Sequence, residues 1–251
     1  MKMGLMFFGF KDCFLQELTL CFISFLTSAI AGIVGLGGGL ILIGILPSFL
    51  PLNAIIPIHG FSQVSSNLSR AYFGKQDIKY SILPSFLLGS FVGVGVFALI
   101  LNFISLEYLP LFIGVYILLS LWSQKFNDSI KKYENYFIIG FFQTGLSVIV
   151  GTTGPLAITK LLKDFQNRNI AVSTSALLMS ISHILKVAIF FWFGFVFFEY
   201  IWTIVSMIIG AILGSYVGTK YGNKLNGKYL LIALKVLLTL LAIKALMSVI
   251  H

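Results

Sequence analysis

Charged residues are scarce in this chain of 251 residues, and acidic residues are the scarcest. Asp, Glu, Lys and Arg make up 10% of the chain, and Asp and Glu together number 8. Soluble domains carry about 25% charged residues, so this composition excludes an ordinary soluble protein. No acidic pair lies in the apolar part of the sequence, which removes the paired carboxylates of many acid–base active sites.

Cysteine is also nearly absent. The two cysteines, Cys13 and Cys21, are eight residues apart, or about 12 Å on one helix, which is too far for a disulfide. They are interpreted as buried thiols. The sequence predicts no metal site, no cofactor and no catalytic residue, because it lacks the His-Glu-x-x-His and Gly-x-Ser-x-Gly patterns.

Apolar residues are abundant in their place. They form 58% of the chain, and the mean hydropathy is +1.00. A helix of about 20 apolar residues crosses a hydrocarbon core of about 30 Å, and apolar runs of roughly this length recur. They are Ile82–Phe103, Leu106–Trp122, Val187–Phe198 continuing past Glu199 to Val217, and Tyr229–Ile250. The sequence therefore predicts an all-α polytopic membrane protein embedded in a lipid bilayer. The start, "MKMGLMFFGFKDCF", lacks a small-x-small cleavage site, so no cleaved signal peptide is expected.

The net charge of +9 comes from basic residues scattered over the predicted loops. In a soluble protein it would suggest nucleic acid, but no nucleic-acid motif is present and no such partner is expected. An excess of Lys and Arg in cytoplasmic loops explains the charge better.

The chain reads as a duplication. "GLGGGLIL" (Gly35–Leu42) aligns with "GTTGPLAI" (Gly151–Ile158) at an offset of 116 residues, which places Arg70 on Lys186. Gly89 and Gly93 match Gly210 and Gly214 after a shift to 121. We therefore expect a first repeat at residues 1–123, a cytoplasmic linker at 124–133 and a second repeat at 134–251.

The basic loops indicate how the repeats are oriented. If each Gly-rich stretch is the tip of a re-entrant hairpin, each repeat is one hairpin plus three crossings, giving about 8 helical membrane segments in two inverted repeats. The basic loops then lie inside and the Glu107 and Glu199 loops outside, although Lys2 and Lys11 fall outside. With four full crossings in each half, the Lys220–Lys228 loop would face outside, against the positive-inside rule.

The Gly-rich tips are candidate anion-binding elements. Clustered glycines break helices, and the N–H groups that this frees at a helix N-terminus bind anions. The alternative is close helix packing, which is the stronger interpretation for Gly89, Gly93, Gly210 and Gly214. The candidate tip residues are Gly35, Gly37, Gly38, Gly39, Gly151, Thr152, Thr153, Gly154 and Pro155.

A polar stripe follows the first tip in "IPIHGFSQVSSNLSR". Its members His59, Gln63, Asn67 and Arg70 share one helix face by spacing. The second half places Ser175, Met179, His183 and Lys186 at the same offset, with Ser182 beside them. Ionisable groups at membrane depth cost about 3 kcal/mol or more and mark pathways. Arg70 and Lys186 could instead snorkel to the interface, and the histidines could make core hydrogen bonds.

These motifs resemble the sulfite exporter family called TauE/SafE, or TSUP. The resemblance covers nearly all of the chain and rests on "GIVGLGGGLIL", "HGFSQVSSNLSR", "GTTGPLAITKLL" and "SHILKVAIF". The second glycine motif departs from the family in reading "GTTGP" rather than a more glycine-rich run. The resemblance implies transport of sulfite, thiosulfate or an organosulfonate across a bacterial inner membrane.

The predicted function is secondary transport of a small anion by alternating access, with the anion site between the two repeats. His59 and His183 could carry a proton. An anion channel and a transporter of another small anion remain alternatives, and an intramembrane enzyme and a scaffold are disfavoured. A homo-oligomer is possible.

Overall fold

The computed structural model describes residues 2–131, 135–153, 156–222 and 227–250, and its elements there are all helical. The first half contains α1 (Lys2–Val34), α2 (Gly38–Ile45), α3 (Leu52–Phe73), α4 (Leu83–Leu101) and α5 (Leu109–Trp122). After α6 (Gln124–Lys131), the second half contains α7 (Tyr136–Val150), α8 (Leu156–Phe165), α9 (Arg168–Trp192), α10 (Ile201–Tyr221) and α11 (Gly227–Ile250). Short 3-10 turns connect them at Leu46–Ser48, Lys75–Asp77, Tyr80–Ile82, Leu106–Tyr108 and Phe197–Tyr200.

Local sequence explains where several helices begin. Asn135 caps α7, and its side chain accepts a hydrogen bond from the N–H of Phe137 at 2.9 Å. Asn167 caps α9 in the same way through the N–H groups of Asn169 and Ile170. A proline stands in the first turn of both α4 and α5, where its missing N–H costs nothing.

Four apolar helices of the described chain are long enough to cross a membrane. They cover Phe14–Val34, Tyr80–Leu101, Arg168–Trp192 and Phe197–Tyr221. The predicted run Val187–Val217 is therefore divided at Gly194, whose φ of 81° ends the helix. The predicted crossing Leu106–Trp122 is also shorter than expected, because its α-helix has 14 residues and spans about 21 Å.

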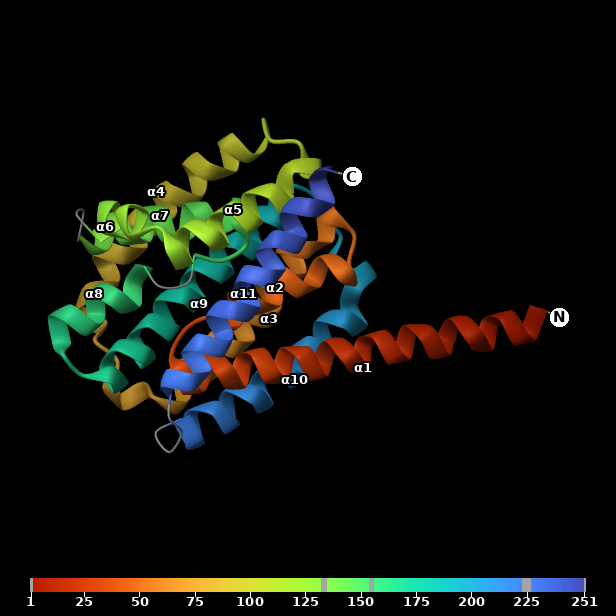
Figure 1. Cartoon of the computed structure of the whole chain (residues 1–251), viewed down its shortest axis with the longest axis horizontal. Helices are drawn as coiled ribbons and strands as arrows, with labels where there is room; N and C mark the ends of the chain where they lie inside the picture. Colours follow the sequence, from red (N-terminus) through yellow and green to blue (C-terminus); the bar gives the residue numbers. More distant parts are fainter. Residues whose placement is uncertain (1, 132–134, 154–155, 223–226, 251) are drawn as a thin grey trace.

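Glycines join the two halves through two helix pairs, α1 with α10 and α4 with α7. A Cβ on Gly210 or Gly214 would fall on the backbone carbonyl of Cys21 or Phe25, respectively. A Cβ on Gly89 or Gly93 would do the same at Phe137 or Phe141. Residue numbers rise together in both pairs, so the paired helices run parallel. Figure 1 shows α1 and α10 along one edge of the molecule and α4 and α7 along the opposite edge.

These contacts repeat with the offsets seen in the sequence. Cys21 and Phe25 on α1 correspond to Phe137 and Phe141 on α7 at 116 residues, and the four glycines correspond at 121. These four glycines are packing residues, as interpreted from the sequence, because backbone lies where a side chain would stand.

The central helices α3 and α9 pack against each other and run antiparallel. The N–H of Lys79, just after α3, donates to Thr174 Oγ1 near the start of α9 at 3.1 Å. Asn53 at the start of α3 instead lines a cavity with Phe190 and Phe193 at the end of α9. Helices equivalent by the 116-residue offset thus point in opposite directions, and their buried faces meet in the middle of the bundle.

Candidate functional site

The first glycine-rich segment breaks the helix as expected. Gly35 and Gly37 have φ values of 91° and 93°, a left-handed conformation that glycine adopts without strain. The first backbone hydrogen bond of α2 runs from the N–H of Ile41 to the carbonyl of Gly37 at 3.0 Å. The preceding N–H groups in the first turn of α2 therefore have no intrahelical acceptor.

The glycines of this tip face different neighbours. A Cβ on Gly39 would lie 2.8 Å from Gln63 Oε1 and 3.2 Å from Thr152 Oγ1, so Gly39 faces the polar centre. A Cβ on Gly38 would fall on the carbonyl oxygen of Thr27, so Gly38 lets α2 pack closely against α1. A Cβ on Gly35 would meet the apolar side chains of Val172 and Ile158.

The second tip is held mainly by its own half. Gly151 has a φ of 79°, and the predicted site residues Gly154 and Pro155 lie outside the described residues. Thr153 Oγ1 donates to the carbonyl of Gln143 at 3.0 Å, so its hydroxyl is already used. Thr152 Oγ1 is buried without a partner among the described residues and lies beside Gly39.

All four members of the α3 stripe are buried. His59, Gln63, Asn67 and Arg70 expose at most 4% of their surface. Arg70 donates through Nη1 to the carbonyl of Ala31 at 2.8 Å and through Nη2 to Asn67 Oδ1, while its Nε is left without a partner. Asn67 Nδ2 donates to the carbonyl of Gln63 at 2.7 Å. The spacing argument therefore placed these groups on one face correctly.

Lys186 reaches across from α9 to join the stripe to both tips. Its Nζ donates to the carbonyl of Gly151 at 2.6 Å and contacts His59 Nδ1 at 3.2 Å. His59 Nε2 lies 3.0 Å from the carbonyl of Gly39. Because that carbonyl can only accept, we assign the proton of His59 to Nε2, which leaves Nδ1 to accept from the ammonium of Lys186.

The two remaining α9 residues differ in their surroundings. The ring of His183 lies 5.7 Å from that of His59, and neither of its nitrogens has a hydrogen-bond partner among the described residues. Ser182 instead bonds Thr144 Oγ1 at 2.8 Å and Gln143 Nε2 at 3.4 Å. The structure thus brings His183 to the centre and places Ser182 in the contact between α9 and α7.

Sequence reasoning missed three groups that shape this centre. Gln143 Oε1 accepts from the N–H of Ala157 at 3.2 Å and so caps α8. Tyr116 Oη donates to the carbonyl of Thr153 at 2.6 Å, and the carbonyl of Ala31 holds Arg70. Gln143 is a lone glutamine inside the apolar run "FIIGFFQTGLSVIV", and that isolated polar residue could have indicated a buried polar role.

Comparison with known protein families identifies a match over most of the chain. The family described as "Sulfite exporter TauE/SafE" matches residues 20–245, which include every candidate site residue. The chain belongs to the TauE/SafE family. It is thus a member of a family of membrane transporters related to sulfite export. No curated protein and no solved structure gives a significant match.

The charge balance of this TauE/SafE chain is unusual at its centre. Among the side chains that the structure describes, Arg70 and Lys186 are the buried Lys and Arg residues, exposing 4% and 0%, and no Asp or Glu is buried. Snorkelling therefore does not describe either residue. Buried cations without a counter-charge are costly, and an anion bound between them would remove that cost.

The central cavity of this TauE/SafE chain is nearly closed. It has a volume of about 10 Å³ and is lined by residues from both tips and from α1, α2, α3 and α9, including Gly39, Gln63, Arg70 and Thr152. This is room for about one water molecule. Admission of an anion of several heavy atoms therefore requires the tips or the two central helices to separate.

Proposed function

We propose that this chain is a secondary transporter of small sulfur-containing anions, with sulfite, thiosulfate and organosulfonates as the substrate class. The observation that carries the proposal is the pair of buried cations, Arg70 and Lys186, with no buried carboxylate among the described side chains. Free N–H groups in the first turn of α2 add a second feature that favours an anion. Family membership supplies the sulfur chemistry.

The site would bind its anion between the two repeats. Arg70 offers its unpartnered Nε, and Lys186 has three donors of which two are used. Gln63, Asn67 and Thr152 can orient oxyanion oxygens through amide and hydroxyl groups. His59 holds Lys186 in place, and His183 offers a ring nitrogen to the substrate or to a proton.

An inverted repeat would make this site suitable for alternating access. The antiparallel course of α3 and α9 and the recurring glycine contacts support two inverted repeats at residues 1–123 and 134–251. In an alternating-access cycle, a central cavity this small would belong to a state between the inward-open and outward-open forms. We place the protein in the bacterial inner membrane as a multi-pass transporter.

Binding to purified protein tests the substrate class. Sulfite, thiosulfate, sulfoacetate and taurine are compared with sulfate, phosphate and chloride by thermal unfolding in detergent. A ligand at about 100 times its Kd stabilises the folded state by about 2.7 kcal/mol, so at least one sulfur anion should raise the melting temperature by several degrees. Saturable flux of that anion in proteoliposomes completes the test. No shift with any sulfur anion contradicts the proposal, and unsaturable flux indicates a channel.

Single cysteines test the orientation in the membrane. In a variant without Cys13 and Cys21, cysteines at Lys75, Lys163 and Lys220 should be protected from an impermeant reagent in whole cells. Cysteines at Asn53 and Glu107 should be labelled. The physical reason is that the basic loops at one end of α3 and α9 stay in the cytoplasm. Labelling of Lys220 together with protection of Lys163 would reject the inverted arrangement.

A further inference from the structure

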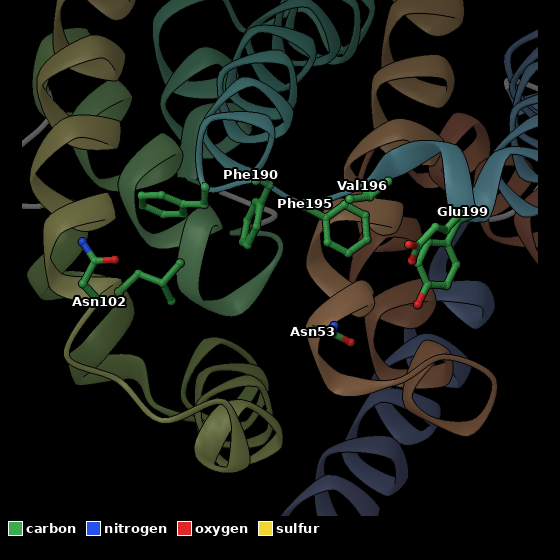
Figure 2. Close-up of a pocket in the computed structure, with 10 residues that line it drawn as sticks. Asn53, Asn102, Phe190, Phe195, Val196 and Glu199 are labelled. Atoms are coloured by element: carbon green, nitrogen blue, oxygen red, sulfur yellow. The ribbon is translucent and has the colours of Figure 1, made fainter.

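A second and much larger cavity opens at the end of the bundle where α3 begins. It has a volume of about 510 Å³, and its lining includes Asn53, Asn102, Phe190, Phe195, Glu199 and Tyr200. Figure 2 shows Phe190 and Phe195 lying between Asn102 on one side and Glu199 on the other, with Asn53 below Phe195. The cavity thus lies where the start of α3, the end of α4 and the end of α9 meet.

The walls of this cavity suit water as well as apolar contact. Two asparagines and one glutamate supply polar groups from three different segments. Pro57 has no N–H to donate to the carbonyl of Asn53 one turn earlier, so that carbonyl lacks its usual helical donor. Polar backbone of this kind at a membrane protein's helix end is tolerated where water reaches it.

The cavity lies on the same two helices as the buried cations. Phe190 follows Lys186 by four residues, so the two side chains are neighbours on one face of α9. Asn53 precedes His59 by six residues, or about 9 Å along α3. Phe190 packs against the main buried apolar cluster, and Lys186 is fully buried. Phe190, which lines the large cavity, is therefore also the helical neighbour of the buried Lys186 on the side toward that cavity.

We propose that this cavity is the outer vestibule of the anion pathway and that Phe190 is the gate between it and Lys186. The proposal rests on the proposed function and adds the route and the gating residue. Glu199 places a negative charge beside the vestibule, which disfavours a bound anion there, so the anion-binding site is assigned to the buried cations and not to this cavity. Opening to this side needs the Phe190 side chain to move away from the end of the cavity nearest Lys186.

A labelling experiment tests the gate without measuring transport. In a variant without Cys13 and Cys21, Lys186→Cys is treated with an impermeant thiol reagent from the outside. Adding Phe190→Ala should raise the labelling rate roughly tenfold, because access controls thiol reactivity. Phe191→Ala is the matched control, since Phe191 is the next residue and is 73% exposed on another face of α9. Equal labelling rates in the two backgrounds overturn the gate.

A flux experiment tests the vestibule with residues outside the cation site. Asn102→Cys lines the cavity, whereas Phe103→Cys, at a residue that is 91% exposed, does not. A bulky thiol reagent should lower the rate of anion flux in proteoliposomes of Asn102→Cys roughly tenfold, because its adduct fills the passage. The same reagent should leave the flux of Phe103→Cys unchanged. Unchanged flux in both modified variants overturns the vestibule.

The two experiments separate this proposal from the proposed function. Normal anion flux with no effect of either Phe190→Ala or the Asn102 adduct overturns the vestibule and leaves the transporter standing. Absence of flux for every sulfur anion, with labelling of Lys186→Cys still raised by Phe190→Ala, supports the connection between vestibule and centre and overturns the assigned substrate class.

Discussion

Arg70→Gln and Lys186→Gln are each expected to weaken anion binding by about 1.5–3 kcal/mol, or roughly 10- to 150-fold in Kd, the scale of a hydrogen bond to a charged group. Both cations are buried in a part of the protein where no described carboxylate is buried, so each contributes directly to the charge that the anion meets. Arg70→Lys should recover only part of the loss, because an ammonium lacks the planar fork that matches an oxyanion. Isothermal titration of the purified variants measures the effect.

Lys235→Gln is the matched control for these two neutralisations. Lys235 lies on α11 with its Nζ 3.8 Å from the ring centroid of Trp122, so its charge already has a partner away from the central cavity. Its neutralisation should leave the Kd within about twofold, since exposed cation–π pairs contribute about 0.5–1 kcal/mol to local packing. Equal dissociation constants for Arg70→Gln, Lys186→Gln and Lys235→Gln would contradict a central anion site.

Gly39→Ala and Gly38→Ala should separate binding from folding at the first tip. The atoms nearest to the methyl added by Gly39→Ala belong to the Gln63 amide and the Thr152 hydroxyl, which are side-chain atoms and not backbone, and the methyl fills the cavity of about 10 Å³. Anion affinity should fall by roughly tenfold or more with little change in melting temperature, because the backbone N–H groups become covered.

Gly38→Ala should have the opposite profile. Its methyl would fall on the carbonyl oxygen of Thr27, so α1 and α2 must separate, and overpacking of this kind costs about 1–3 kcal/mol or more. We expect a lower melting temperature and a lower yield of assembled protein. Thermal unfolding and binding are measured on both variants. Normal affinity in Gly39→Ala assigns that glycine to packing as well.

These glycines show what the sequence could and could not predict. The cluster itself indicated a broken helix, and Gly35 and Gly37 do take left-handed conformations. Which glycine faces the polar centre depends on the neighbours that other helices bring, and those are invisible in a local pattern. The polar stripe from His59 to Arg70 was predictable because one helix carries all of it, and helical spacing determines the shared face.

Contacts between helices that the sequence does not show explain the other differences. Ser182 and His183 are adjacent in sequence, but neighbours on a helix point about 100° apart, so one faces α7 and the other faces His59. Gln143 reaches α8 through a contact that no spacing rule contains. The loop predicted at Glu199 is present as the turn Phe197–Tyr200, but the break begins a few residues earlier, at Gly194 inside the apolar run.

The parallel pairing of α1 with α10 also determines the order in which the protein can assemble. The backbone surface of α1 around Cys21 and Phe25 meets Gly210 and Gly214, which leave the ribosome about 190 residues later. At roughly 5–20 residues per second, α1 waits about 10–40 s in the membrane before its main partner exists. During that interval the surface of α1 around Cys21 and Phe25 contacts lipid or an insertion factor instead of α10. Release of the chain before α10 is complete therefore leaves this face of α1 uncovered, although α2 and α3 can already pack against other parts of the helix.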